Sequence, residues 1–167
     1  GRLVAYKGYK NLIEAASMLP KNYIFNLVGD GPEKELLKKY IKSYKIENRF
    51  FIHTKVNENK KHNFLKNSDL FCFTSNTRAE SFGISLLEAI NYSLPVVVSD
   101  NKGSGMQDMI VNNYNGFNFK NNCPEDLKQK ILNSTKDRRT LLTLSRNSKR
   151  LFKKRFYNKN IRNKIFK

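Results

Sequence analysis

The sequence contains no tryptophan, only two cysteines and four prolines, and less than half as many acidic as basic residues. Cys72 and Cys123 lack the close spacing of a zinc or redox site, so we expect neither a disulfide nor bound zinc. No apolar run approaches the roughly 18 residues that cross a membrane, and residues 1–10 lack the regions of a signal peptide. We therefore expect a cytoplasmic location.

What the sequence does contain is enough apolar material for one folded domain and a large excess of positive charge. Of its 167 residues, 39% are hydrophobic, and its formal net charge is +18. Residues 128–167 hold 15 of the 32 basic residues and only one of the 14 acidic ones. This basic helical segment is either a surface for nucleic acid or anionic lipid, or a solvated helix face in a chain rich in Lys and Asn throughout.

Short β-rich runs alternate along the chain with segments of helical periodicity. Strands are predicted near residues 23–28, 50–52, 70–73 and 95–98, and a turn at Asn115-Gly116. Helices are predicted near residues 11–19, 32–41, 57–65, 82–90 and 124–156, the last broken near 136–137. This alternation favours an α/β fold, a Rossmann-like doubly wound parallel sheet. Gly1-Arg2-Leu3 has the pattern of a strand end whose beginning lies outside the sequence.

Ligands bind such a sheet at the carboxyl ends of its strands, so the loops there should carry the functional residues. Arg2 and Lys7 place two cations near one strand end, which suits a diphosphate. Glu80 and Glu88 are about two helical turns apart, so both can face one ligand, and Gly83 lets helix-start N–H groups approach an anion. Each feature also has a structural explanation: cations are common here, Glu80 can cap the helix, and Glu88 can pair with a lysine.

Five segments occur in an order that matches a known family. They are Gly1-Arg2-Leu3 with Tyr6-Lys7-Gly8, LVGDGP at residues 27–32, SDLF at 68–71, ESFGISLLEA at 80–89 and LPVV at 94–97. Together they resemble glycosyltransferase family 4, which consists of retaining nucleotide-sugar transferases of the GT-B architecture. The resemblance runs from residue 1 to about 135, and its most specific part is ESFGISLLEA. It implies that residues 1–167 are one half of a GT-B fold, the donor-binding half.

The resemblance also implies roles for individual residues. Arg2 and Lys7 match the pair that binds the diphosphate in place of a metal, Glu80 matches the acid against the donor sugar, and Glu88 matches the acid that holds the ribose hydroxyls. Glu80, Arg2 and Lys7 are therefore the expected catalytic residues. Further donor-binding residues implied by the match are Val56, Lys61, Phe82, Gly83 and Ile84. The sequence departs from the family at Thr54 and Ser93, where glycine is usual.

The implied activity is transfer of a hexose from a UDP- or GDP-sugar to a glycan or lipid-linked acceptor in cell-surface polysaccharide biosynthesis. The resemblance implies retention of configuration and no cofactor or metal. No residues match the N-terminal Rossmann domain that binds the acceptor, so this chain alone is expected to transfer no sugar. Its expected partners are the sugar nucleotide, that missing domain and the inner face of an anionic membrane. Two alternatives stay open: a basic nucleic-acid-binding module and a non-catalytic sugar-nucleotide-binding fragment.

Overall fold

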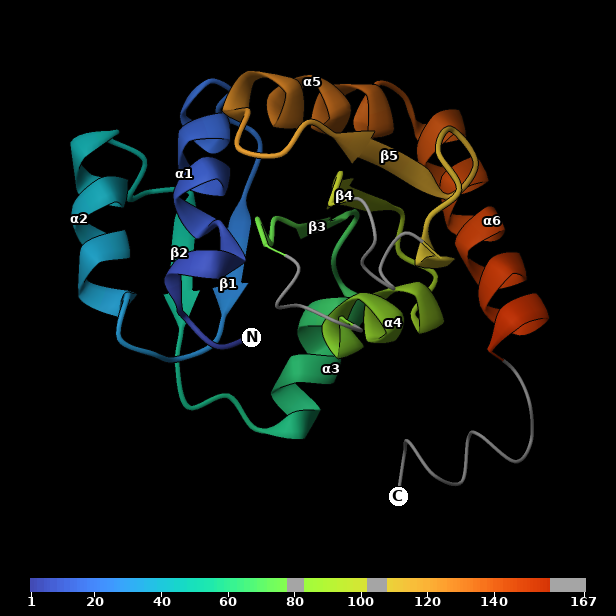
Figure 1. The fold of residues 1–167 in the computed structure, drawn as a ribbon, viewed down its shortest axis with the longest axis horizontal. Helices are drawn as coiled ribbons and strands as arrows, with labels where there is room; N and C mark the ends of the chain where they lie inside the picture. Colours follow the sequence, from blue (N-terminus) through green and yellow to red (C-terminus); the bar gives the residue numbers. More distant parts are fainter. Residues whose placement is uncertain (78–82, 102–107, 157–167) are drawn as a thin grey trace.

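The computed structural model describes residues 1–77, 83–101 and 108–156 (Figure 1). Strands and helices alternate in it as the sequence predicts, and the α/β fold class is confirmed. The elements are, in chain order, the 3₁₀ turn η1 (Ala5–Lys7), α1 (Tyr9–Ser17), β1 (Phe25–Val28), α2 (Lys34–Ser43), β2 (Phe50–His53), α3 (Glu58–Lys66), β3 (Phe71–Phe73), α4 (Ile84–Asn91), β4 (Val96–Ser99), β5 (Gly116–Phe119), α5 (Pro124–Thr135) and α6 (Arg138–Arg155).

Within the described residues the strands form two parallel sheets. β1 pairs with β2, and β4 lies between β3 and β5. The sequence predicted only a turn at Asn115-Gly116, but the structure places strand β5 directly after Asn115. Gly116 lies so close to β4 that a Cβ there would be 1.8 Å from the carbonyl oxygen of Val96. The pairing with β4 and the burial of Phe119 therefore make this segment a strand.

The N-terminal segment, residues 1–8, lies between the carboxyl ends of the two sheets. Residues 1–4 carry no strand pairing, although the sequence pattern of Gly1-Arg2-Leu3 is that of a strand end. The Gly1 amine donates a hydrogen bond to the Val28 carbonyl at the end of β1. Further along, the Asn76 N–H donates to the Tyr6 carbonyl at 2.8 Å, just after β3. The segment thus connects the two sheets at one end of the molecule.

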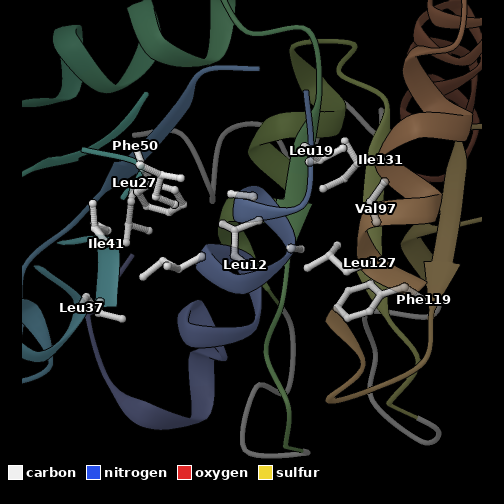
Figure 2. Packing of buried hydrophobic residues seen from close by; sticks show 14 of the residues in the cluster. Leu12, Leu19, Leu27, Leu37, Ile41, Phe50, Val97, Phe119, Leu127 and Ile131 are labelled. Carbon is white, nitrogen blue, oxygen red and sulfur yellow. The ribbon is translucent and has the colours of Figure 1, made fainter. Parts of the chain in front are cut away.

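One buried apolar cluster joins the two sheets through α1 and α5 (Figure 2). Leu12 of α1 and Ile131 of α5 belong to it, together with Phe50 from the first sheet and Val97 and Phe119 from the second. A second cluster lies under α4 and α6, and Phe152 and Phe156 pack against it, as their helical spacing predicts. Helices therefore cover both faces of the second sheet, as in a doubly wound domain.

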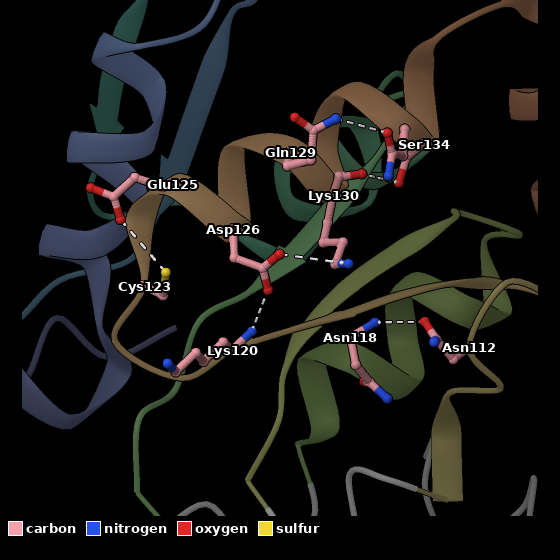
Figure 3. A network of polar contacts seen from close by, with 10 residues as sticks. Asn112, Asn118, Lys120, Cys123, Glu125, Asp126, Gln129, Lys130 and Ser134 are labelled. Atoms are coloured by element: carbon pink, nitrogen blue, oxygen red, sulfur yellow. Dashed lines mark hydrogen bonds and ion pairs between the residues drawn. The ribbon is translucent and has the colours of Figure 1, made fainter.

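Side-chain caps fix where two helices, α3 and α6, begin. The Asn57 side chain accepts a hydrogen bond from the Lys60 N–H at 2.9 Å and so caps α3, which starts where the sequence predicts a helix, near residue 57. Asp137 accepts one from the Thr140 N–H at 2.6 Å, which lowers the pKa of its carboxyl and starts α6 at the predicted break. At the first turn of α5, Asp126 accepts from the Lys120 N–H at 2.7 Å, which ties β5 to that helix (Figure 3).

Ser93, in the turn between α4 and β4, has a φ of +64°. This is the left-handed region, which a residue with a Cβ adopts at a cost of roughly 1–2 kcal/mol. Glycine has no Cβ and adopts this φ without that cost, which explains why glycine is usual at this position in the turn.

We predict that Ser93→Gly raises the free energy of unfolding by up to about 1 kcal/mol, because the relieved strain exceeds the added entropy of the unfolded chain, about 0.4–1 kcal/mol. Ser93→Val should lower it, since a β-branched side chain fits this region worse. Urea unfolding at constant m-value measures both changes. A glycine variant less stable than the parent would contradict the assignment.

Candidate functional site

A cavity of about 660 Å³ runs along β1 and β3 and extends to residues at their carboxyl ends. Polar side chains from three separate parts of the chain line it. Among them are Lys7 of η1, Lys61 of α3, and Ser85 and Glu88 of α4. Three residues that the sequence singled out, Lys7, Lys61 and Glu88, are therefore brought to one cavity.

Lys61 forms ion pairs with two carboxylates at this cavity. Its Nζ lies 2.8 Å from Oε1 of Glu88 and 2.7 Å from Oε2 of Glu58. Partial burial works to lower the pKa of Lys61, but the hydrogen bonds and attraction from the two carboxylates raise it above its ordinary value. The ammonium therefore stays charged at neutral pH and holds Glu88 against the cavity wall.

The two carboxylates on Lys61 differ in their exposure. The side chain of Glu88 is 20% exposed and lines the cavity, whereas that of Glu58 is 75% exposed. Pairing with a lysine was the structural explanation that the sequence left open for Glu88, and the structure contains that pair. The pairing also orients Glu88, because a carboxylate held by one charged hydrogen bond is restricted in position.

Lys7 is fixed by close packing of η1 against the end of β3. Gly8, which follows it, has a φ of +65°, and a Cβ there would lie 2.1 Å from the Thr74 carbonyl oxygen. The Thr74 hydroxyl donates to the Lys7 carbonyl at 2.7 Å. The Lys7 ammonium lies over the ring of Phe73, 5.5 Å from its centroid. Backbone and side chain of Lys7 are therefore both held at the end of this strand.

Arg2 lies on the other half of the N-terminal segment. It is exposed and is not among the residues that line the cavity, although its neighbour Gly1 is. The Leu3 N–H donates to the Asp30 carbonyl at 2.8 Å. A Cβ on Gly31 would lie 2.5 Å from the Leu3 carbonyl oxygen. The GDGP turn thus brings the backbone around Arg2 close to the end of β1.

Three further predicted residues that the structure describes, Val56, Gly83 and Ile84, are not among those that line this cavity. Gly83 is buried and starts α4 with a φ of +58°, while Ile84 is 63% exposed. Val56 lines a second cavity of about 700 Å³ beside the end of β2, where Thr54 also lies. Glu80 and Phe82 lie outside the described residues.

A polar cluster that sequence reasoning missed lies after β3 and β4. Ser99 and Asn101, both buried, donate to the Ser75 carbonyl. The Asn121 side chain donates to Asn101 Oδ1 at 2.8 Å and to the Asn76 carbonyl at 2.9 Å. These contacts hold together the carboxyl ends of the second sheet. The sequence does contain a sign of this cluster, because a serine or an asparagine lies two residues after the end of each of β3, β4 and β5.

Residues 1–151 match the model of the family described as glycosyl transferases group 1. The chain belongs to this family. An uncharacterized glycosyltransferase of Methanocaldococcus jannaschii is 30% identical over 160 residues, which cover 93% of this chain and 40% of that protein. The poly(ribitol-phosphate) alpha-N-acetylglucosaminyltransferase of Staphylococcus aureus is 32% identical over 134 residues, which cover 78% of this chain and 26% of that protein. The chain therefore spans less than half the length of either relative.

Among solved structures, HepE of Anabaena in complex with UDP and glucose is similar to this glycosyltransferase chain. The TM-score is 0.86 at 25% identity, covering 99% of this chain and 45% of HepE. The similarity confirms the Rossmann-like fold of the GT-B glycosyltransferases. In the part of this chain that the structure describes, no helix combines the length and apolar character needed to cross a membrane.

Proposed function

We propose that this chain is the donor-binding half of a retaining, metal-independent glycosyltransferase of cell-surface polysaccharide synthesis. It binds a UDP-sugar, and the complete enzyme transfers the hexose to a glycan or lipid-linked acceptor. The observation that carries the proposal is the convergence of Lys7, Lys61 and Glu88 on one cavity at the strand ends. Two similar proteins support it: HepE is complexed with UDP and glucose, and the S. aureus relative is named as a transferase that acts on poly(ribitol-phosphate).

The chemistry of these side chains suits the parts of a nucleoside diphosphate. The Glu88 carboxylate accepts hydrogen bonds from the two ribose hydroxyls, and its ion pair with Lys61 holds it in place. Lys7 and Arg2 supply positive charge to the diphosphate. Gly83 opens α4, so the first N–H groups of that helix add to the positive potential beside the phosphates.

The proposed reaction breaks the bond between the anomeric carbon and the diphosphate oxygen and forms one from that carbon to an acceptor hydroxyl. Negative charge builds on the diphosphate as the bond breaks, and Lys7, Arg2 and the helix end stabilise it. The acceptor proton passes to the departing phosphate, so no general base on this chain is needed. Glu80 is assigned a contact with the donor sugar, as the family resemblance implies. Val56 and Phe82 are assigned further contacts with the sugar nucleotide.

We predict that UDP raises the melting temperature of the chain and that Glu88→Gln lowers its affinity for UDP by about tenfold or more, since a hydrogen bond to a charged group contributes about 1.5–3 kcal/mol. Glu58→Gln is the matched control, because Glu58 contacts the same Lys61 but lies in solvent. Thermal shift over a UDP series measures both. Equal losses in the two variants would contradict the assignment of Glu88, and a larger shift with GDP would overturn the choice of base.

We further predict that the chain alone transfers no sugar from a UDP-sugar to added glycan acceptors, because the acceptor site belongs to the other half of the enzyme. Chromatography of the radiolabelled donor after incubation measures transfer. The control is the same chain joined to an N-terminal half of a relative. Turnover by residues 1–167 alone would refute this division of labour.

We also propose that α6 rests on an anionic membrane surface. Its buried residues Leu144, Ser148 and Leu151 form one stripe at helical spacing, and the helix contains no acidic residue. The opposite side carries exposed cations, defined here as the basic face: Arg139, Arg146, Arg150 and Lys153. Such a face attracts acidic headgroups, with about 1 kcal/mol per basic residue close to the surface. This contact would bring the enzyme to a lipid-linked acceptor.

The chain should cosediment with vesicles of phosphatidylcholine and phosphatidylserine at low salt, but not with pure phosphatidylcholine. Replacing the four residues of the basic face with glutamine should weaken this binding at least tenfold. The matched control replaces four exposed lysines elsewhere, Lys21, Lys39, Lys42 and Lys60, which changes the net charge equally. Equal weakening in both variants, or preferential binding to duplex DNA, would overturn the membrane assignment.

A further inference from the structure

The short element that carries Lys7 buries little of its own surface. The three residues of η1 are all partly or fully exposed, and the residue before them, Val4, has an apolar side chain that cannot cap the turn. The hydrogen bonds of η1 are those of one turn: the Lys7 N–H donates to the Val4 carbonyl and the Gly8 N–H to that of Ala5, both at 3.1 Å. A single turn of this kind has little stability by itself. The position of Lys7 therefore depends on contacts from outside η1.

Two consecutive residues after β3 supply such contacts. Thr74 Oγ1 donates a hydrogen bond to the Lys7 carbonyl at 2.7 Å, and Ser75 Oγ donates one to the Tyr6 carbonyl at 3.1 Å. Thr74 is 3% exposed and Ser75 is 1% exposed. A hydroxyl withdrawn from water needs a hydrogen-bond partner, so burial of these two residues favours the observed place of η1 over others.

The side chain of Lys7 contacts the same strand end. Its ammonium lies 5.5 Å from the ring centroid of Phe73, the last residue of β3, and 5.6 Å from that of Tyr6. Both distances are within the range of cation–π attraction. Phe73 immediately precedes Thr74, so two neighbouring residues contact the ammonium and the carbonyl of Lys7. A shift of this strand end would move both ends of the lysine.

The strand end is itself tied to the other strands of the second sheet. The Ser75 carbonyl accepts hydrogen bonds from the Ser99 hydroxyl and from the Asn101 amide, both of which are buried. Ser99 is the last residue of β4, which lies between β3 and β5. Asn121, after β5, donates to Asn101 Oδ1 at 2.8 Å. Residues at the ends of β4 and β5 thus hold Ser75 by its carbonyl, and Ser75 and Thr74 in turn hold η1 by their hydroxyls.

We propose that Thr74 and Ser75 are positioning residues, which set the place of the Lys7 ammonium and thereby the affinity of the cavity for a diphosphate. The inference rests on the proposed function, in which Lys7 supplies positive charge to that diphosphate. Because the two hydroxyls act through the backbone of η1, their effect appears with a ligand that carries phosphates and not with the nucleoside alone. A role in stability alone would instead weaken the binding of every ligand alike.

The test replaces Thr74 with valine, which has nearly the same shape but no hydroxyl, and with serine, which keeps the hydroxyl. Ser134→Ala is the matched control, because Ser134 is also buried and its hydroxyl donates to a backbone carbonyl, that of Lys130 in α5, at 2.8 Å. Lys7→Met removes the ammonium and keeps an unbranched side chain. Affinities for UDP and for uridine are measured on each variant by NMR titration.

Amide hydrogen exchange without ligand tests the hold on η1 directly. The Lys7 and Gly8 N–H groups close that turn, and Val97 in the central strand β4 is the internal reference. We expect Thr74→Val to speed exchange at both groups about fivefold relative to Val97, the factor in an equilibrium constant that a neutral hydrogen bond contributes. Thr74→Ser and Ser134→Ala should leave it unchanged. Unchanged exchange in Thr74→Val would overturn the proposal.

We expect Thr74→Val to lower the affinity for UDP about fivefold and to leave that for uridine unchanged. Thr74→Ser should bind both ligands as the parent does. Ser75→Ala should have a smaller effect, because the Tyr6 carbonyl still accepts from the Asn76 N–H at 2.8 Å. In a chain that already carries Lys7→Met, Thr74→Val should lower UDP affinity no further. Equal losses for UDP and uridine would assign Thr74 a structural role alone and would also overturn the proposal.

The Lys7→Met variant separates failure of this proposal from failure of the proposed function. If Lys7→Met leaves UDP affinity unchanged, Lys7 makes no contact with the diphosphate, and both its proposed role and the positioning role of Thr74 are wrong. If Lys7→Met weakens UDP binding about tenfold or more but Thr74→Val does not weaken it, the role of Lys7 stands and the positioning role of Thr74 alone is wrong.

Discussion

The arrangement of this molecule depends on how closely the backbone of residues 1–8 approaches the ends of two sheets. Three glycines permit that approach. A Cβ on Gly29 would lie 1.7 Å from the Gly1 carbonyl oxygen, one on Gly31 would lie 2.5 Å from that of Leu3, and one on Gly8 would lie 2.1 Å from that of Thr74. Backbone cannot yield to such contacts without moving a strand end. The positions of Arg2 and Lys7 therefore follow from the absence of side chains at other residues.

Lys61 positions Glu88 at the cavity, as the three glycines position Arg2 and Lys7. A partly buried carboxylate needs a donor, and Glu88 has one in Lys61 at 2.8 Å. Lys61 also contacts Glu58 on its own helix, one turn earlier, so α3 supplies both the cation and a second, exposed carboxylate. The charge near Glu88 is thus set by a helix other than its own. This makes the packing of α3 beside α4 a condition for the chemistry of the cavity.

Local patterns in the sequence predicted much of the fold. The cap at Asn57 and the helix break near Lys136-Asp137 were predicted, because both depend on short-range hydrogen bonds; that Asp137 itself caps α6 comes from the structure. Strand β5 depends instead on pairing with β4, and the alternation in Phe117-Asn118-Phe119 is too short to predict a strand by itself. The Ser99 and Asn101 cluster was missed for the same reason: its partner is a backbone carbonyl after another strand.

The candidate site was likewise predicted in part: its residues could be found in the sequence, but their arrangement in space could not. Lys7 and Glu88 were found from their places in the predicted elements and from resemblance to a family, and Lys61 from the resemblance alone. Their meeting in one cavity depends instead on three elements packed by the core. The large cluster that includes Leu12, Val97 and Phe119 fixes the two sheets relative to each other through α1 and α5. The backbone of residues 1–8 fixes them at the carboxyl ends. The positions of Lys7 and Glu88 relative to each other are therefore set by packing and hydrogen bonds between elements that are distant in sequence, which no local pattern predicts.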